Sequence, residues 1–193
     1  MQIEYEATFI PVDKDEVRAQ LKSAGAKLVR SEFLQKRSVF HLPQGHDITG
    51  GWARVRDEGN RITLSIKIVN GSNIEDQKES QIVIDSFEEG KQILMLLGCR
   101  EKAYQETYRE LWKLDGVEIT IDTWPFLEPF VEIEGESESV VRSVAEKTGF
   151  DWSQAQFCAV GTLYSKKYNL STEIINDRTP RIVFNMENPF QGK

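Results

Sequence analysis

Strict alternation of polar and apolar residues recurs along the whole chain and constrains its fold more than any other feature. In residues 62–68, four aliphatic side chains alternate with Thr63, Ser65 and Lys67. Successive side chains of a β-strand point to opposite faces of the sheet, so such a segment has one apolar and one polar face. The same pattern returns in residues 117–122, which predicts an antiparallel sheet rather than a parallel one.

Eight strands and several helices follow from the periodicity and from the turn residues between them. Asp13, with Glu16 three residues later, has the pattern that starts a helix, and Gly25 the pattern that ends one. Strands are predicted at 2–10, 34–42, 52–56, 61–69, 77–85, 102–113, 117–123 and 130–134, and helical segments at 13–24, 86–98, 138–147 and 152–168. The predicted class is therefore α+β.

Alternation defines two faces of each strand but does not say which face lies inside. One interpretation is an antiparallel sheet whose polar face meets solvent. The other is a closed barrel whose polar faces converge on its interior, while helices cover the apolar faces. Periodicity alone leaves both interpretations open.

Composition limits the classes of protein to which the chain can belong. Its 193 residues suffice for one large domain with a full core, and no apolar run approaches the length that spans a bilayer. Cys99 and Cys158 are too few for a disulfide framework. We therefore expect a cytoplasmic protein without a membrane segment. The net charge of −7 argues against a nucleic-acid partner, although it allows a local basic pocket for a polyanion.

Two pairs of carboxylates lie on polar strand faces at opposite ends of the chain. Glu4 and Glu6 share one face of the first strand, and Glu132 and Glu134 share one face of the last. If the strands are neighbours, four like charges come together and need cations. Oxygen ligands suit hard divalent ions such as Mg²⁺ or Mn²⁺. The alternative for each pair is a solvated strand edge.

Basic residues also lie on the polar faces of other strands. Arg54 and Arg56 share a face, and Lys67 and Arg109 lie on the polar faces of later strands. Arginine offers a planar fork of donors that matches phosphate oxygens, although structural ion pairing is the simpler alternative. Carboxylates, a divalent ion and arginines together are what a triphosphate requires, because the metal neutralises charge and the basic groups hold the phosphates.

These motifs resemble those of the CYTH or triphosphate tunnel metalloenzyme superfamily, over roughly residues 2–168. The segment 4–8, Glu-Tyr-Glu-Ala-Thr, resembles the Glu-x-Glu-x-Lys motif that opens the family, and 130–135, Phe-Val-Glu-Ile-Glu-Gly, resembles its late acidic strand. Residues 52–56, 63–67 and 107–109 are similar to its basic strands. The superfamily includes class IV adenylyl cyclases, thiamine triphosphatases and inorganic triphosphatases.

The resemblance implies a closed eight-stranded antiparallel β-barrel, a tunnel flanked by helices, with its charges inside. A tunnel domain would span 1–170, followed by a C-terminal extension over 171–193. Implied catalytic residues are Glu4, Glu6, Arg54, Arg56, Lys67 and Arg109; implied substrate-binding residues are Arg54, Arg56, Lys67, Arg109 and Glu79; implied ligands of Mg²⁺ or Mn²⁺ are Glu4, Glu6, Asp122, Glu132 and Glu134. The partner would be a small-molecule triphosphate or another polyanion, and a homodimer is a candidate assembly.

Two positions depart from the family pattern. Thr8 and Thr107 stand where the family has lysines that help to bind phosphates, and Lys102 and Lys113 are the candidates to replace them. The leading hypothesis is a metal-dependent hydrolase or cyclase that acts on a nucleoside, organic or inorganic triphosphate. The alternatives are a protein of this family that binds phosphorylated metabolites without efficient turnover, and a structural barrel with solvated charges.

Overall fold

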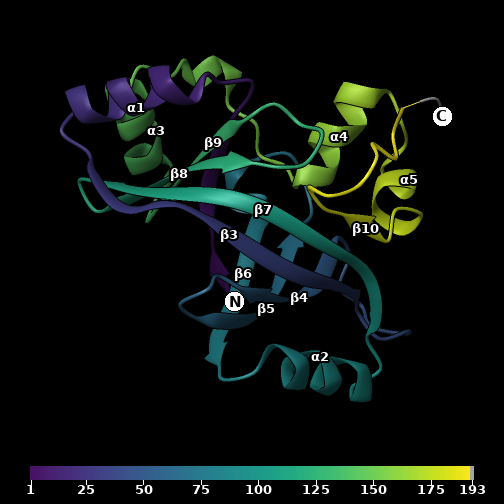
Figure 1. Cartoon of the computed structure of the whole chain (residues 1–193). Coiled ribbons are helices and arrows are strands. Elements are labelled where there is room, and N and C mark those ends of the chain that lie inside the picture. Colours follow the sequence, from purple (N-terminus) through teal and green to yellow (C-terminus); the bar gives the residue numbers. More distant parts are fainter. Residues whose placement is uncertain (192–193) are drawn as a thin grey trace.

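The computed structural model describes residues 1–191, and its centre is an almost closed antiparallel barrel of nine strands (Figure 1). The hydrogen-bonded order is β1-β6-β5-β4-β3-β7-β8-β9-β2. The strands are β1 Gln2–Ile3, β2 Tyr5–Phe9, β3 Lys27–His41, β4 Gly51–Asp57, β5 Ile62–Val69, β6 Gln77–Ile84, β7 Arg100–Leu114, β8 Val117–Thr123 and β9 Phe130–Gly135. The barrel interpretation, rather than an open sheet with a solvated face, is confirmed.

The first strand closes the barrel by dividing in two. The expected strand 2–10 is interrupted at Glu4: β1 pairs with β6, and β2 pairs with β9. Because β1 and β2 are consecutive segments of one stretch, the nine strands form the eight sides that the sequence predicts. At the break between β1 and β2, the Glu4 N–H donates a hydrogen bond to the Gln77 carbonyl at 2.9 Å. This bond holds the chain where it passes from β6 to β9.

Strand β3 starts at Lys27, earlier than the predicted residue 34. Its first half pairs with β7 through register shifts between Leu28 and Arg30 and between Arg30 and Phe33. A bulge places an extra residue in one strand and breaks the two-residue period. The periodicity therefore could not reveal this half of the strand.

Helices cover parts of the outer surface of the barrel (Figure 1), and apolar side chains pack beneath them. Helices α1 (Lys14–Ser23) and α3 (Glu138–Lys147) bury Val17, Leu21 and Val141 in the same core as the apolar faces of β2, β8 and β9. Helix α2 (Phe87–Leu96) packs Leu94 into a separate core with Val55 of β4. With its outside covered in this way, the barrel turns its polar faces inward.

The C-terminal segment packs against the barrel. The predicted helix over 152–168 is instead a 3₁₀ turn, Trp152–Gln154, followed by α4, Val160–Tyr168. Helix α5 (Thr172–Asp177) and strand β10 (Arg181–Ile182), which pairs parallel with β7, come next. Their apolar residues share a core with Trp124 and Tyr164. The division of the chain at residue 170 stays a prediction.

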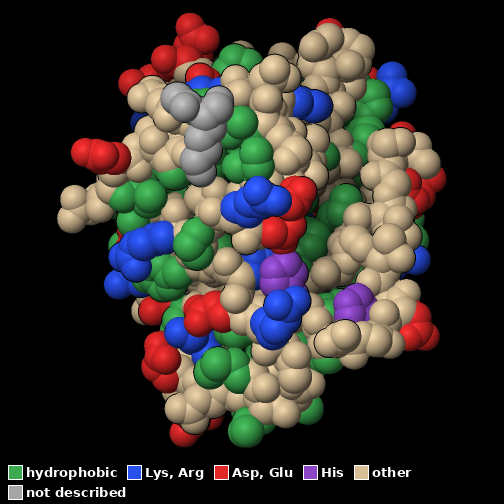
Figure 2. Space-filling model, turned by 90° about the vertical axis from the view of Figure 1, so that its right-hand side faces the viewer, with side chains coloured by type: hydrophobic (Ala, Val, Ile, Leu, Met, Phe, Trp, Pro, Cys, Tyr) green, Lys and Arg blue, Asp and Glu red, His purple; other side chains and the backbone are tan. Residues whose placement is uncertain are grey.

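The outer surface contrasts with the barrel interior. Viewed from the side of the C-terminal elements, acidic, basic and apolar side chains are interspersed (Figure 2). None of the helices within residues 1–191 combines the length and apolar character that a membrane span requires.

Candidate active site

A cavity of about 270 Å³ runs inside the barrel. All of the predicted site residues except Asp122 line it: Glu4, Glu6, Arg54, Arg56, Lys67, Glu79, Arg109, Glu132 and Glu134. The volume is near the lower end of the range for small-molecule sites, roughly 300–1,000 Å³. Half of the lining residues are charged, so the cavity suits a compact ionic ligand.

Strand parity explains how residues distant in sequence meet here. On β4, Arg54 and Arg56 line the cavity, while the alternate residues Ala53 and Val55 are fully buried in the core beneath α2. On β9, Glu132 and Glu134 face the cavity, while Val131 and Ile133 pack into the core beneath α1 and α3. Because the apolar side chains of each strand pack into the core beneath the helices, the charged side chains that alternate with them point into the tunnel.

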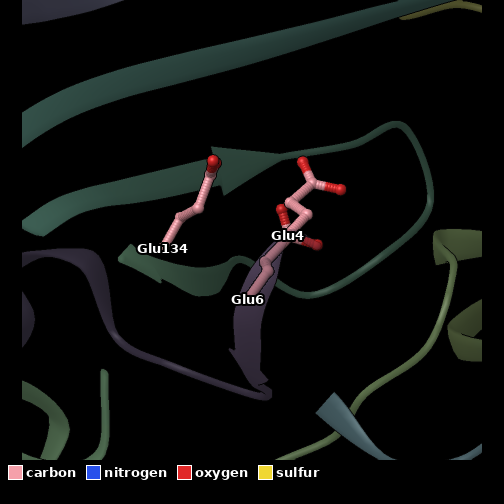
Figure 3. Close-up of side chains that lie close together, drawn as sticks. All are labelled: Glu4, Glu6 and Glu134. Atoms are coloured by element: carbon pink, nitrogen blue, oxygen red, sulfur yellow. The ribbon is translucent and has the colours of Figure 1, made fainter. Parts of the chain in front are cut away.

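Three carboxylates form a compact acidic cluster, shown in Figure 3. Glu4, Glu6 and Glu134 each offer an oxygen, and these oxygens lie within 4.8 Å of one another. Glu6 stands directly opposite Glu134 in the β2–β9 register. Burial, reinforced by the charge of Glu6, raises the pKa of Glu4 to about 8. Repulsion of this kind is relieved when a cation binds.

The other two expected metal ligands, Asp122 and Glu132, lie beside Arg109, and only Glu132 lines the cavity. The Arg109 guanidinium donates to both oxygens of Asp122 at 2.8 Å and to Glu132 at 2.6 Å. Asp122 is fully buried and also accepts a hydrogen bond from the Thr120 hydroxyl at 2.7 Å. Of the five carboxylates expected to bind metal, the structure thus brings three together and engages two with arginine.

Ion pairs order the remaining charges. Arg54 contacts Glu79 at 2.8 Å, and Lys67 contacts Glu4 at 2.7 Å and Glu6 at 3.3 Å. Burial alone would raise the pKa of Glu79, but the charges of Arg54 and Lys67 outweigh it and lower the pKa to about 2. Glu79, expected to bind substrate, is therefore an ionised partner of Arg54.

Two buried charged residues of the lining were not predicted from the sequence. Glu58 pairs with Arg56 at 2.8 Å, and Arg37 of β3 lines the cavity beside Gln35. The parity of Gln35 and Arg37 was a usable signal. It was obscured because Lys36, on the opposite face, is also charged, so this segment lacks a clear polar and apolar alternation.

Comparison with known proteins agrees with the barrel and with its charged interior. The family model described as the CYTH domain matches residues 2–154, which is most of the chain. The chain belongs to the CYTH family.

Individual relatives support this assignment. A protein of Methanocaldococcus jannaschii described as a putative adenylate cyclase is 28% identical over 123 residues, which cover 63% of this chain and 70% of the relative. A conserved hypothetical protein of Pyrococcus furiosus superposes with a TM-score of 0.67 at 22% identity, covering 81% of this chain and 96% of that one. The latter similarity shows a shared fold.

Two further solved structures share the CYTH fold at lower identity. A protein of Vibrio parahaemolyticus, described as a putative adenylate cyclase, gives a TM-score of 0.72 at 13% identity and covers 85% of this chain and 98% of its own. A Hippeastrum protein gives a TM-score of 0.57 at 12% identity and covers 90% of this chain and 99% of its own. Its structure is described as that of a putative adenylyl cyclase that "reveals a dominant triphophatase activity".

Thr8 and Thr107, the positions at which the motif resemblance implies lysines, are both buried. Thr107 is fully buried, and its hydroxyl accepts a hydrogen bond from Arg37 at 2.5 Å. Thr8 stands opposite Glu132 in the β2–β9 register. Of the two candidate replacements, Lys102 lines the cavity, whereas Lys113 is half-exposed and pairs with Glu118 at 3.5 Å.

Acid titration gives a prediction for the metal-free CYTH protein. The pKa values of Glu4 and Glu132 rise to about 8, mainly through burial, from 4.5. Between about pH 4.5 and 8 the folded protein holds protons that the unfolded chain has released, so stability falls as pH rises. Chemical unfolding in EDTA should show a loss of at least about 1.4 kcal/mol across this window, the equivalent of one pKa unit. Constant or rising stability would contradict these pKa directions.

Proposed function

We propose that the tunnel binds a triphosphate together with Mg²⁺ or Mn²⁺ and hydrolyses its terminal phosphate. One observation carries the proposal: the cavity inside the barrel is lined both by a compact acidic cluster and by a set of buried arginines. Neither group alone would indicate a triphosphate. Together they match a ligand that is itself a polyanion and travels with a divalent cation.

The acidic cluster fits a hard divalent ion. Glu4, Glu6 and Glu134 supply only carboxylate oxygens, which Mg²⁺ and Mn²⁺ prefer, and burial, reinforced by the charge of Glu6, raises the pKa of Glu4. When bound, such an ion supplies positive charge that neutralises phosphate oxygens and polarises the phosphorus. The cluster would hold the ion at one side of the tunnel, where Lys67 offsets part of the carboxylate charge.

Arginines supply the other half of the phosphate site. Arg54 and Arg56 are each 8% exposed, and each has an Nε–H without a hydrogen-bond partner. Buried donors normally find an acceptor, so these groups are available to phosphate oxygens. Their pairing with Glu79 and Glu58 fixes the direction of each fork in advance of binding.

Hydrolysis is favoured over cyclisation by two considerations. The small, charged cavity matches a phosphate chain better than a whole nucleotide, and the Hippeastrum relative is described as a dominant triphosphatase. Glu132 lies outside the acidic cluster, lines the cavity and accepts a hydrogen bond from Arg109 at 2.6 Å, and burial raises its pKa to about 8. It is therefore our candidate to accept a proton from the attacking water.

The direct test is phosphate release from inorganic triphosphate, thiamine triphosphate and ATP, each with Mg²⁺, with Mn²⁺ and with EDTA. We expect metal-dependent release of phosphate from at least one of them. Chromatography of the ATP reactions would detect cyclic AMP, and a cyclic product without phosphate release would overturn the hydrolase assignment. Binding of a triphosphate without either product would favour the second candidate, a binding protein.

The second candidate rests on Thr8, where the family has a phosphate-binding lysine. One charge-assisted hydrogen bond is worth about 1.5–3 kcal/mol, so its loss slows turnover about tenfold to a hundredfold if the lysine acts in the transition state. Thr8→Lys should therefore raise the rate of phosphate release or the affinity for triphosphate. Steady-state kinetics of this variant beside the wild type measure both. Rapid wild-type turnover with no gain in the variant would show that other groups already supply the charge.

A further inference from the structure

Arg37 is a buried cation without a carboxylate partner. It is 5% exposed, and no carboxylate of residues 1–191 lies within salt-bridge distance of it, whereas Arg54, Arg56 and Lys67 each have one. Its Nη2 donates to neutral acceptors only, Gln35 at 2.9 Å and Thr107 at 2.5 Å, and its Nε–H has no partner. Burying an unpaired charge is costly, so this geometry is typical of a site that awaits an anion.

The amino end of α4 faces the same cavity, and Ala159, Val160 and Gly161 contribute to its wall. The first N–H groups of a helix have no partner within it. A serine or aspartate side chain caps each of the other α-helices, but Ala159 cannot cap α4. A Cβ at Gly161 would lie 2.8 Å from the Asn176 amide oxygen, so glycine permits the close packing of this helix end.

Aromatic contacts join these two features. The Arg37 guanidinium lies over the Trp124 ring, 4.5 Å from its centroid, and Trp124 packs edge-on against Tyr164 of α4 with centroids 6.4 Å apart. The unpaired cation and the uncapped helix end thus belong to one corner of the tunnel. Helix N-termini and guanidinium groups both bind phosphate oxygens.

We propose that Arg37 and the amino end of α4 form a second anion subsite in the tunnel, which holds one end of the bound phosphate chain. This inference rests on the proposed function. It also explains why Thr107 is tolerated: the neighbouring strand supplies, through Arg37, a positive charge beside the position where the family has a lysine.

Calorimetric titration with inorganic triphosphate in EDTA tests the subsite. Arg37→Gln should weaken binding about tenfold to a hundredfold, the loss of one charge-assisted hydrogen bond. It should also raise the melting temperature of the ligand-free protein, because an uncompensated buried charge is gone. A purely structural arginine would give the reverse: a lower melting temperature and unchanged affinity. Arg142→Gln, on the exposed face of α3, is the control for net charge and should bind like the wild type.

A second variant changes the amino end of α4 and leaves Arg37 in place. Ala159→Asp places a carboxylate where it caps α4, so the folded protein should be no less stable while affinity for inorganic triphosphate falls about tenfold. Ser171→Asp adds the same charge at the start of α5, and Ser171 does not line the cavity, so it should bind like the wild type. Wild-type affinity in Ala159→Asp would overturn the role of the helix.

Failure of this subsite can be told apart from failure of the proposed function. If the wild-type protein does not bind inorganic triphosphate, either with or without Mn²⁺, the second subsite and the proposed function are both wrong. If Arg56→Gln weakens binding while Arg37→Gln and Ala159→Asp bind like the wild type, the tunnel binds phosphate but the second subsite is wrong. Should Arg37→Gln not fold, Arg37→Lys, which keeps the charge but not the fork, should show weakened binding with normal stability.

Discussion

Replacing Glu134 with glutamine should reduce metal-dependent phosphate release by at least about a hundredfold, while making the metal-free protein no less stable. A bound divalent ion contributes several kcal/mol of charge stabilisation to the reaction, and each 1.36 kcal/mol is a factor of ten in rate. Glu134 has no basic partner within 4.0 Å among the described residues, so its loss breaks no ion pair. Removing one of three crowded carboxylates relieves repulsion.

Two measurements check this expectation. Thermal melting with and without Mn²⁺ should show a metal-induced rise in the wild type and a much smaller one in Glu134→Gln. Glu136→Gln, two residues further along the chain and outside the cavity, is the matched control and should retain both the rise and the activity. If Glu134→Gln keeps the full rise in melting temperature, Glu134 is not a metal ligand.

Removing Arg109 should lower the free energy of unfolding by about 3–5 kcal/mol, the largest loss of stability we expect of a single substitution in the tunnel. Asp122 is fully buried, and both of its oxygens accept hydrogen bonds from Arg109. Deleting one partner of a buried pair leaves an uncompensated charge, and losses of this size follow. Urea unfolding of Arg109→Gln measures the change directly.

A double substitution separates the buried charge from lost packing. Arg109→Gln combined with Asp122→Asn should recover much of the stability, because the amide carries no charge that needs a partner. Lys147→Gln removes an exposed ion pair with Asp115 and should change stability by less than about 1 kcal/mol. A loss of similar size in all three variants would show that the Arg109–Asp122 pair has no special role.

Much of the barrel was predictable because its strands obey one period. In 62–68 and 117–122, apolar and polar side chains alternate without interruption. The apolar face of these strands is the outer side of the barrel, and the polar face is its inner side. The early start of β3 was not predictable, because bulges interrupt its period. Nor was the break at Glu4, since it depends on where the first and last strands meet rather than on local sequence.

The candidate site was predictable as a set of inward-facing residues but not as pairs. Parity placed Glu134 and Asp122 on polar faces, yet only the inter-strand register shows that Glu134 joins Glu6 while Asp122 meets Arg109. Register depends on the lengths of turns and on bulges between strands, and periodicity does not record these. Besides the charge of Lys36, which obscured the alternation, the contact of Arg37 with Thr107 on the neighbouring strand β7 depends on this register.

The most direct test is a crystal structure of the protein grown with Mn²⁺ and inorganic triphosphate, with anomalous diffraction used to locate manganese. Our account predicts an anomalous peak among Glu4, Glu6 and Glu134, with phosphate oxygens on the guanidinium groups of Arg54 and Arg56 inside the tunnel. Manganese bound away from these carboxylates, or a triphosphate bound outside the tunnel, would contradict it.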